Sequence, residues 1–544
     1  MIHGLARRWS LSGLMLASIF LLPLLALVGQ SLLPDEAVFQ HLKDTVLWHY
    51  VGNTVLLVVL VGVGSLLIGT PLAWLLAMCR FPGHKVFQWA LLLPLAMPSY
   101  LVAYVYTDLF DYAGPVQRGL RYIMGFSSPA DYYFPEVRSL GGAAIMLALV
   151  LFPYVYLLAR TAFLEQSSNL VQASRIMGCS PWRSFFRLSV PMVRPALAVG
   201  VSLVAMETIA DFATVNYFAV STLTTAIYDT WLGLGSLGAA AKLSCITLLV
   251  IFAVIGAERY ARRKQKHYQK QDDKPQDFVY QLSGTKGWLA TGFCSLILLL
   301  AFFLPFAVLL DYAINYFDVS WNAKFLEYSL NSLWISLVVA IVCCLFSLML
   351  MFVRRISPRK IDSVFPRIGS MGYAIPGTVL AIGVLIPLTA LDFAINDLAD
   401  YMAWQRPGLW LSGGTFALVL AFSVRFCAIT IGSVENSYKR ISPSLDMASI
   451  TMGSGPWRLL GRVHFPLLRK GLLAGSLLVF IESMKELPAA LLLRPIGFEN
   501  LATYVYQFVS DEMLEQGALP AIVIVLVGLV PIILLNRSLE QTNH

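Results

Sequence analysis

The chain contains repeated apolar runs of about 20 residues, each long enough to cross a hydrocarbon core of about 30 Å as a helix. Only 13% of its 544 residues are charged, whereas an ordinary globular protein carries about 25%. Because a membrane offers the backbone no water, each run must satisfy its own polar groups as a helix. The sequence therefore predicts an all-α polytopic membrane protein with about twelve transmembrane helices. We place them roughly at 10–32, 52–78, 86–110, 140–162, 195–219, 236–257, 287–311, 330–353, 365–390, 411–433, 470–493 and 517–536.

The loops between these runs alternate in charge. Basic loops, such as the one with Arg80 and Lys85, are followed by acidic loops, such as the one with Asp131 and Glu136. Basic residues concentrate on the cytoplasmic side of membrane proteins. This pattern predicts a multi-pass protein with both termini cytoplasmic, and it accounts for the net charge of +8 without nucleic acid as a partner. The expected partner of the spans is the lipid bilayer.

One polar stretch occurs twice. Of the 22 positions in 173–194, ten carry the same residue 275 positions later, in 448–469. Asn53 matches Asn331 and Pro98 matches Pro376, both at an interval of 278. The duplication predicts two tandem six-helix repeats, 1–257 and 287–544, joined by a basic cytoplasmic linker at 258–286.

Each copy of the duplicated stretch forms a cytoplasmic loop, at about 163–194 and 434–469. A glycine is expected to end one helix in the left-handed conformation, and a proline to begin a short helix. A second proline should mark the return to the membrane. Tryptophans at the headgroup boundary and arginines that follow the charge rule would explain the single residues. The duplicated set favours docking of a partner instead: Ala173, Gly178, Pro181, Trp182, Arg183, Arg187 and Pro191, then Ala448, Gly453, Pro456, Trp457, Arg458, Arg462 and Pro466.

Acidic residues interrupt two matched apolar runs. Glu207 and Asp211 lie in one run, and Glu482, Lys485 and Glu486 in the other. An ionised group at mid-membrane costs at least about 2.5–3.5 kcal/mol, so such groups usually line a polar pathway. We predict a translocation pathway lined by these five residues. The alternative is structural pairing, in which Lys485 neutralises Glu482 or Glu486.

The pattern G-x-x-P-W-R, with a proline thirteen residues after the glycine, resembles the cytoplasmic loop signature of ABC-importer permeases. The family pattern begins Glu-Ala-Ala, whereas this chain has Gln172 and Met447 in place of the glutamate. The resemblance implies a fused type I permease whose two loops are coupling helices for two ATPase subunits. ATP and magnesium would bind to those partners and no cofactor to this chain, which is itself no enzyme. It also implies a bacterial inner membrane location and a soluble extracytoplasmic binding protein as a further partner.

The acidic stretches, Glu207 to Val215 and Lys485 to Pro495, resemble the fused permeases of bacterial ferric-iron importers. That resemblance implies ferric iron as substrate, and carboxylate oxygens suit a hard cation. No resident metal site is expected, and transient contact with Fe3+ would fall on Glu207, Asp211, Glu482 and Glu486. A permease of the same plan for phosphonate, thiamine or another small solute is the alternative. A secondary transporter that needs no ATPase is the alternative from another class.

Overall fold

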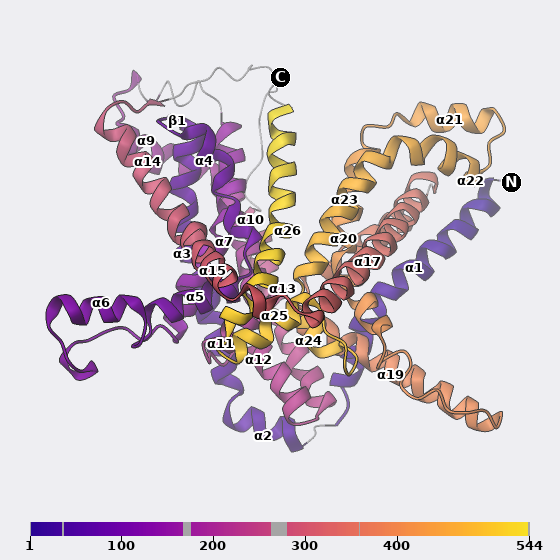
Figure 1. Cartoon of the computed structure of the whole chain (residues 1–544). Helices are drawn as coiled ribbons and strands as arrows, with labels where there is room; N and C mark the ends of the chain where they lie inside the picture. Colours follow the sequence, from indigo (N-terminus) through magenta and orange to yellow (C-terminus); the bar gives the residue numbers. More distant parts are fainter. Residues whose placement is uncertain are drawn as a thin grey trace. The chain divides into compact units, whose positions relative to one another are not determined.

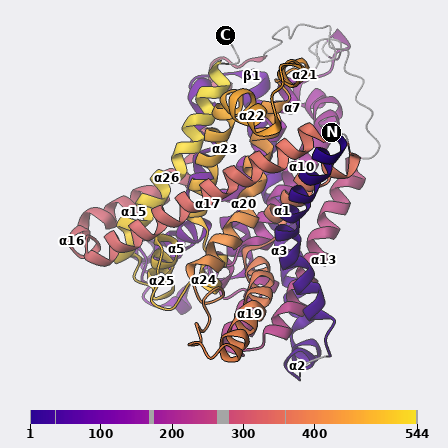
Figure 2. The same cartoon turned by 90° about the vertical axis from the view of Figure 1, so that its right-hand side faces the viewer.

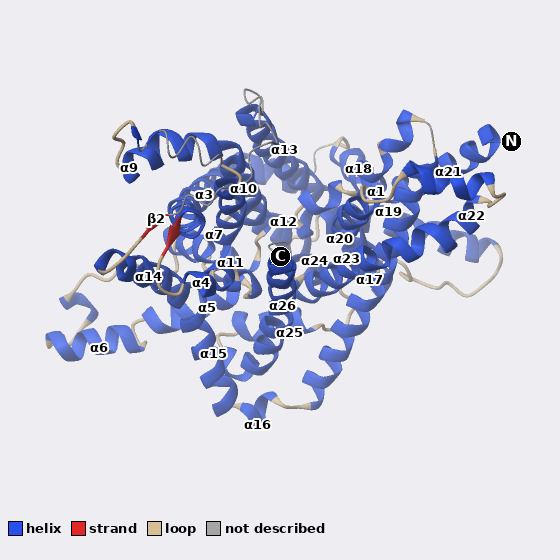
Figure 3. Cartoon of the chain, turned by 90° about the horizontal axis from the view of Figure 1, so that it is seen from above, coloured by secondary structure: helices blue, strands red, loops and turns tan. Residues whose placement is uncertain are grey.

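The computed structural model describes residues 2–34, 37–166, 174, 176–262, 280–357 and 359–541. Helices dominate this part of the chain, as Figure 3 makes plain. Those of the first half are α1 (Ile2–Ser31), α2 (Ala37–Thr45), α3 (Leu47–Met78), α4 (His84–Ala90), α5 (Ser99–Phe110), α6 (Pro115–Met124), α7 (Leu140–Leu164), α9 (Pro181–Ser184), α10 (Val190–Ala210), α11 (Ala213–Tyr217), α12 (Leu223–Tyr228) and α13 (Leu237–Arg262). Those of the second half are α14 (Thr285–Leu298), α15 (Leu304–Asn315), α16 (Phe317–Ser320), α17 (Ala323–Ile356), α18 (Phe365–Gly369), α19 (Gly377–Tyr401), α20 (Thr415–Tyr438), α21 (Pro443–Thr451), α22 (Pro456–Leu459), α23 (Phe465–Lys485), α24 (Pro488–Leu493), α25 (Leu501–Ser510) and α26 (Leu514–Gln541).

The number of membrane spans agrees with the prediction. Among the described residues, 11 helices are long and apolar enough to cross a membrane. A bent pair, His84–Ala96 with Ser99–Met124, would make twelve. The all-α polytopic fold class is therefore confirmed.

The predicted third spans, 86–110 and 365–390, are each interrupted in the structure, and in the second half a continuous apolar helix, Gly377–Tyr401, begins after the interruption. Pro98 and Pro376 each precede the first residue of a helix, α5 and α19, with φ of −55°. Each follows a short 3-10 turn, Leu93–Ala96 or Met371–Ala374. A proline has no N–H to give to a continuing helix and disfavours the helical conformation in the residue before it. The two matched prolines therefore mark the same break in both halves.

Hydrogen bonds repeat along with the sequence. The Asn53 side-chain amide donates to the Ser221 carbonyl at 3.0 Å, and that of Asn331 donates to the Glu499 carbonyl at 3.0 Å. Both pairs are 168 residues apart. Identical side chains thus tie the second span to the same distant loop in each half, as expected for a structural duplication.

The chain packs as two compact units, and each unit takes helices from both halves of the sequence. Unit 1 comprises 1–45, 226–248 and 322–504, and unit 2 comprises 46–225, 249–321 and 505–544. Within unit 1, α1 packs against α17, α18 and α19 (Figures 1 and 2). Within unit 2, α3, α7 and α10 pack together, and α15 packs against α5 and α26. The predicted repeat boundaries are a division of the sequence and stay a prediction.

A two-residue parallel bridge ties the end of the predicted linker to unit 2. The bridge joins β1 (Cys79–Arg80) to β2 (Tyr280–Gln281), beside α14 in Figure 3. The Tyr280 ring lies 5.9 Å from that of Trp74, which is 5.2 Å from the Phe185 ring. Residues 263–279 of the predicted linker lie outside the described residues.

Candidate functional site

Both duplicated loops turn at their glycine in the predicted left-handed conformation. The φ angles are +79° at Gly178 and +81° at Gly453. In each loop the N–H after the glycine donates to a carbonyl five residues back, from Cys179 to Ser174 at 3.0 Å and from Ser454 to Ser449 at 3.1 Å. This is the hydrogen bond of a Schellman motif, which ends a helix on a left-handed residue. The predicted left-handed conformation of the two glycines is confirmed.

The return to the membrane differs from the prediction. The short helices α9 and α22 do not stop at a proline but pass through a π-helical turn, Phe185–Ser189 or Leu460–His464, straight into α10 or α23. Pro191 and Pro466 lie in the first turn of those long helices. The expected interruption of the chain at these prolines is wrong, because the wider π turn before each proline lets the helix continue without the N–H that proline lacks.

The loops present apolar and basic side chains to solvent. Trp457 is 66% exposed, Met452 77% and Phe186 64%. The predicted docking residues Arg183, Arg187, Pro191, Ala448, Arg458, Arg462 and Pro466 are also exposed, and Pro456 is half-buried. Ala173 and the side chains of Pro181 and Trp182 lie outside the described residues. Exposed aromatic, Met and Arg side chains are the types enriched at protein interfaces.

An ionic cluster that the sequence did not reveal holds the second loop in place. The Arg355 guanidinium donates to Asp446 Oδ2 at 2.6 Å, and His464 Nε2 lies 2.9 Å from Asp446 Oδ1. His464 is fully buried, with its Nδ1 3.1 Å from the Tyr438 hydroxyl. Asp446 directly precedes Met447, where the family pattern has glutamate. The presence of an acidic residue one position before the expected glutamate was the sequence signal that could have indicated this cluster.

The fifth span of each half ends at an acidic residue, where the predicted span 195–219 was continuous. Helix α10 stops before Asp211, whose Oδ1 accepts the N–H groups of Thr214 at 3.0 Å and Val215 at 3.3 Å. Its Oδ2 accepts the hydroxyls of Ser99 at 2.6 Å and Thr214 at 3.0 Å. Asp211 thus caps α11 and joins it to Ser99, the first residue of α5. The breaks of the third and fifth spans meet at this carboxylate.

The second half repeats the arrangement with other side chains. Helix α23 stops before Glu486, whose Oε1 accepts the Ala489 N–H at 3.3 Å and lies 3.3 Å from an Arg425 guanidinium nitrogen. Gly377, the first residue of α19, adjoins this pair, and a Cβ there would lie 2.4 Å from Glu486 Oε1. Arg425 is the residue that the sequence reasoning missed.

The structure also identifies the partner of Lys485. Its ammonium donates to Glu482 Oε1 at 3.0 Å, along the last turn of α23. Glu207 lies one turn before Asp211 and is half-buried. Glu207 and Asp211 belong to unit 2, and Glu482, Lys485 and Glu486 belong to unit 1. A pathway role for these five residues stays a prediction.

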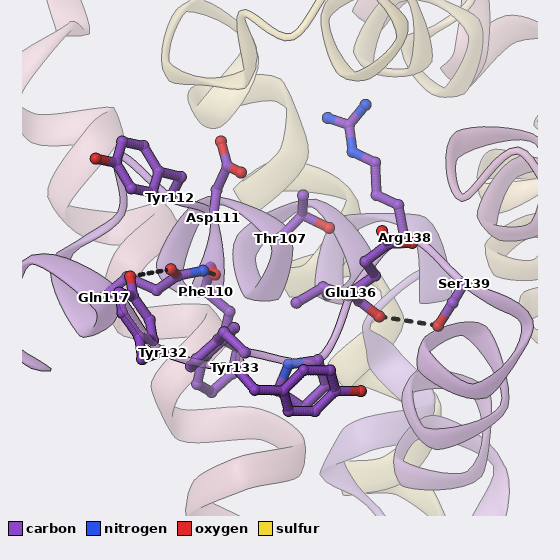
Figure 4. A pocket seen from close by; sticks show the side chains of 13 residues that line it. Thr107, Phe110, Asp111, Tyr112, Gln117, Tyr132, Tyr133, Glu136, Arg138 and Ser139 are labelled. Carbon is purple, nitrogen blue, oxygen red and sulfur yellow. Dashed lines mark hydrogen bonds between the residues drawn. The ribbon is translucent and has the colours of Figure 1, made fainter. Parts of the chain in front are cut away.

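Unit 2 also has an open cavity of about 940 Å3, at the end of α7 opposite the first duplicated loop (Figure 4). Two of its lining residues are bonded to each other, since the Tyr132 hydroxyl donates to Gln117 Oε1 at 2.6 Å. Arg138 at its rim donates to Glu512 at 2.5 Å and to the hydroxyl of Tyr217, the last residue of α11, at 3.2 Å. The cavity is therefore linked through α11 to Asp211. The other polar lining residues are Thr107, Asp111, Tyr112, Tyr133, Glu136 and Ser139.

Both halves of the sequence match a family of known proteins. The family described as "Binding-protein-dependent transport system inner membrane component" matches the chain twice, at residues 69–266 and 351–542. The chain belongs to this family. It is the permease subunit of an ABC importer, a multi-pass inner membrane protein and not itself an enzyme.

Relatives of two lengths match. The Fe(3+)-transport system permease protein FbpB 2 of Haemophilus influenzae is 24% identical over 489 residues, 89% of each chain. The molybdenum transport system permease protein ModB of Escherichia coli is 29% identical over 205 residues, 36% of this chain and 86% of its own. The sulfate transport system permease protein CysW of Escherichia coli is 26% identical over 284 residues, 49% of this chain and 92% of its own. The match to the Fe(3+) permease covers 89% of this chain and so reaches into both copies of the family domain.

Proposed function

We propose that this permease carries ferric iron across the inner membrane by alternating access, driven by two ATPase subunits that bind its two cytoplasmic loops. The relative named for Fe(3+) transport matches 89% of this chain and 89% of its own. The relatives named for molybdenum and sulfate transport match 36% and 49% of this chain. Likeness over 89% of the chain supports iron over the other substrates.

The continuity between each loop and a helix break supports the coupling mechanism. In the second half, residues Pro456–Lys485 form one span of 30 residues from the loop to the residue before Glu486. At 1.5 Å per residue, such a helix is roughly 45 Å long. A movement of the docked loop would therefore reach the break along one continuous helix, in both halves alike. This continuity is the observation on which the mechanism rests.

The chemistry of the breaks is compatible with a hard cation. Carboxylate oxygens are the ligands that hard cations prefer, and Glu207, Asp211, Glu482 and Glu486 supply them near the two breaks. A transported ion must leave again, so contacts to it would be few and transient. ATP and magnesium would bind only to the ATPase subunits.

A permease for an oxyanion is the second candidate, because two cations also lie at the second break. Lys485 and Arg425 each lie beside a glutamate, Glu482 and Glu486. At the second break these two pairs carry as much positive as negative charge. The matching residues of the first half, Glu207 and Asp211, are both acidic. Together the residues at the two breaks therefore carry more negative than positive charge, which favours a cation.

Uptake in reconstituted vesicles tests the substrate. Vesicles containing the permease with its ATPase subunits and binding protein should accumulate radiolabelled ferric iron only when ATP is present. Excess molybdate, sulfate, phosphonate or thiamine should not compete. Accumulation of one of these solutes instead of iron would overturn the substrate proposal, and uptake without the ATPase subunits would favour a secondary transporter.

The binding protein is proposed to dock on the side opposite the loops, where unit 2 has its cavity. Arg138 links the rim of this cavity to α11 and so to the first break. With both termini cytoplasmic, this side would face the periplasm. Reporter fusions at the two termini test the orientation, and crosslinking from Tyr133, which is exposed at the cavity, tests the docking.

A further inference from the structure

The two helix breaks have the same backbone geometry but different chemistry. In each, an acidic residue follows the last residue of a long helix and accepts the N–H three residues ahead, Thr214 for Asp211 and Ala489 for Glu486. The interval between the two sets is 275 in both cases. In the first half the carboxylate is also bound by the Ser99 hydroxyl at 2.6 Å. In the second half the matching position, 278 residues on, is Gly377.

Glycine at 377 makes room for the longer acid and for an arginine. A Cβ on Gly377 would lie 2.4 Å from Glu486 Oε1 and 2.7 Å from an Arg425 guanidinium nitrogen. Both distances are closer than non-bonded atoms approach. The arginine replaces Val150 of the first half, 275 residues earlier, which is buried. Three positions therefore differ together: serine, aspartate and valine in one half, and glycine, glutamate and arginine in the other.

Arg425 lies in the middle of α20, where a charged side chain is costly in a membrane. It is buried, and so is Glu486. Two buried ions of opposite charge stabilise each other only when they stay close, and removing one leaves the other uncompensated. The arginine is thus in a position to hold the Glu486 carboxylate directed at the first turn of α24.

We propose that Arg425 is a positioning residue that fixes the helix break of the second half through Glu486, the task that Ser99 performs through Asp211 in the first half. The residues at positions 377, 425 and 486 depend on one another, so we expect that they can be replaced together by the matching residues of the first half. The first half holds its break with a hydroxyl group, and the second half holds its break with an ion pair. This proposal concerns the helix break and does not depend on which solute is carried.

Hydrogen exchange of the full-length permease in nanodiscs tests the proposal. Arg425→Val should speed amide exchange in residues 487–494 by about tenfold or more, because opening of α24 becomes easier. Residues 212–218 should keep their exchange rate. Ser99→Ala is the matched variant, and it should speed exchange in 212–218 and leave 487–494 unchanged. Arg425→Lys keeps the charge and should restore part of the protection.

The decisive variant transfers the chemistry of the first half to the second. The triple substitution Gly377→Ser, Arg425→Val and Glu486→Asp should return exchange of residues 487–494 to within about twofold of the wild-type rate. Unchanged exchange in Arg425→Val would overturn the proposal. So would a triple variant as labile as Arg425→Val, or equal effects on both segments. If Arg425→Val does not fold, the triple variant and Ser99→Ala still decide the question. If the wild-type permease failed to take up iron while the exchange results were as expected, only the proposed substrate would be contradicted, and the role of Arg425 would stand.

Discussion

Gly178 and Gly453 are the residues at which each loop depends on a conformation that other residues rarely adopt. Their positive φ angles place the short helices α9 and α22 relative to the preceding turn. Among the described residues, apart from the immediate chain neighbours, no atom lies within 4 Å of a Cβ built on either glycine. A side chain there would therefore meet no steric obstacle, and its cost would come from the backbone alone.

Replacing both glycines with valine should uncouple ATP hydrolysis from transport. The left-handed conformation costs an L-residue roughly 1–2 kcal/mol, so the loop would shift to another conformation and lose its docking geometry. We expect uptake to fall about tenfold while the chain still inserts, since 1.4 kcal/mol corresponds to a factor of ten. Gly461→Ala is the control, because Gly461 lies in a π-helical turn without a positive φ. Normal coupling in the valine variant would argue against docking at these loops.

The pair Glu482 and Lys485 allows the pathway role to be separated from simple pairing. Glu482→Gln should lower uptake several-fold in either case, because it leaves the Lys485 ammonium without its carboxylate. Adding Lys485→Met removes that second charge. If Glu482 contacts the transported ion, the double variant should stay impaired in iron uptake. Recovery of uptake in the double variant would mean that Glu482 serves only to pair with Lys485.

Individual residues differed in how far the sequence revealed them. The two glycines were predictable because the αL conformation favours one residue type and the motif occurs twice. Arg425 was not, since one arginine in an apolar run has no local signal and its partner, Glu486, is 61 residues away in the chain. The partner of Lys485 could not be chosen either, because both glutamates lie within one helical turn of it.

At the level of elements, helix α21 carries the second loop and is held by Asp446. The side chains of Arg355 and Asp446 are 20% and 14% exposed, and that of His464 is fully buried. A nearby pair, Arg354 of α17 with Glu435 of α20, is 39% and 34% exposed. The buried cluster should therefore matter more for the position of the loop than the exposed pair does.

Asp446→Asn should weaken binding of the ATPase subunit about tenfold. The substitution removes the charge between Arg355 and His464 and lets α21 move, while the exposed loop side chains stay intact. Binding of a purified ATPase subunit to the permease in nanodiscs measures the effect. Glu435→Gln is the matched control and should change binding less than about twofold, as exposed ion pairs contribute little. Equal effects of the two substitutions would contradict an anchoring role for Asp446.

The long elements were predictable from hydropathy, and their interruptions were not. Helix α7, Leu140–Leu164, lies within two residues of the predicted 140–162. The fifth span was placed at 195–219, yet α10 ends at Ala210. The extent of an apolar run predicts how long a membrane helix is. Whether a carboxylate inside the run ends the helix depends on groups that are distant in the sequence, such as Ser99. The prolines at 98 and 376 were visible as a matched pair, and their role as helix breaks required the structure.

On the scale of the whole molecule, the duplicated sequence does not correspond to two separately packed halves. Helix α1 of the first half packs in unit 1 against α17 and α19, and α15 and α26 of the second half pack in unit 2. The sequence of an apolar helix says little about which helices it will pack against. The packing of helices from one half with those of the other could therefore not be predicted from the repeat. It means that neither half contains all the helices of either unit.

Cutting the chain within residues 263–279 should therefore give two fragments that are stable only together. The first fragment would lack α15 and α26 of unit 2, and the second would lack α1 of unit 1, which leaves apolar faces of the remaining helices without their partners. Co-expressed fragments should assemble and keep most of the uptake, because each fragment supplies the helices that the other one lacks. Each fragment alone should be degraded or aggregate. Quantitative blotting of membranes, with size-exclusion chromatography of the extracted fragments, measures this. A single fragment that is abundant and monodisperse would mean that the exchanged helices contribute little to the stability of the units.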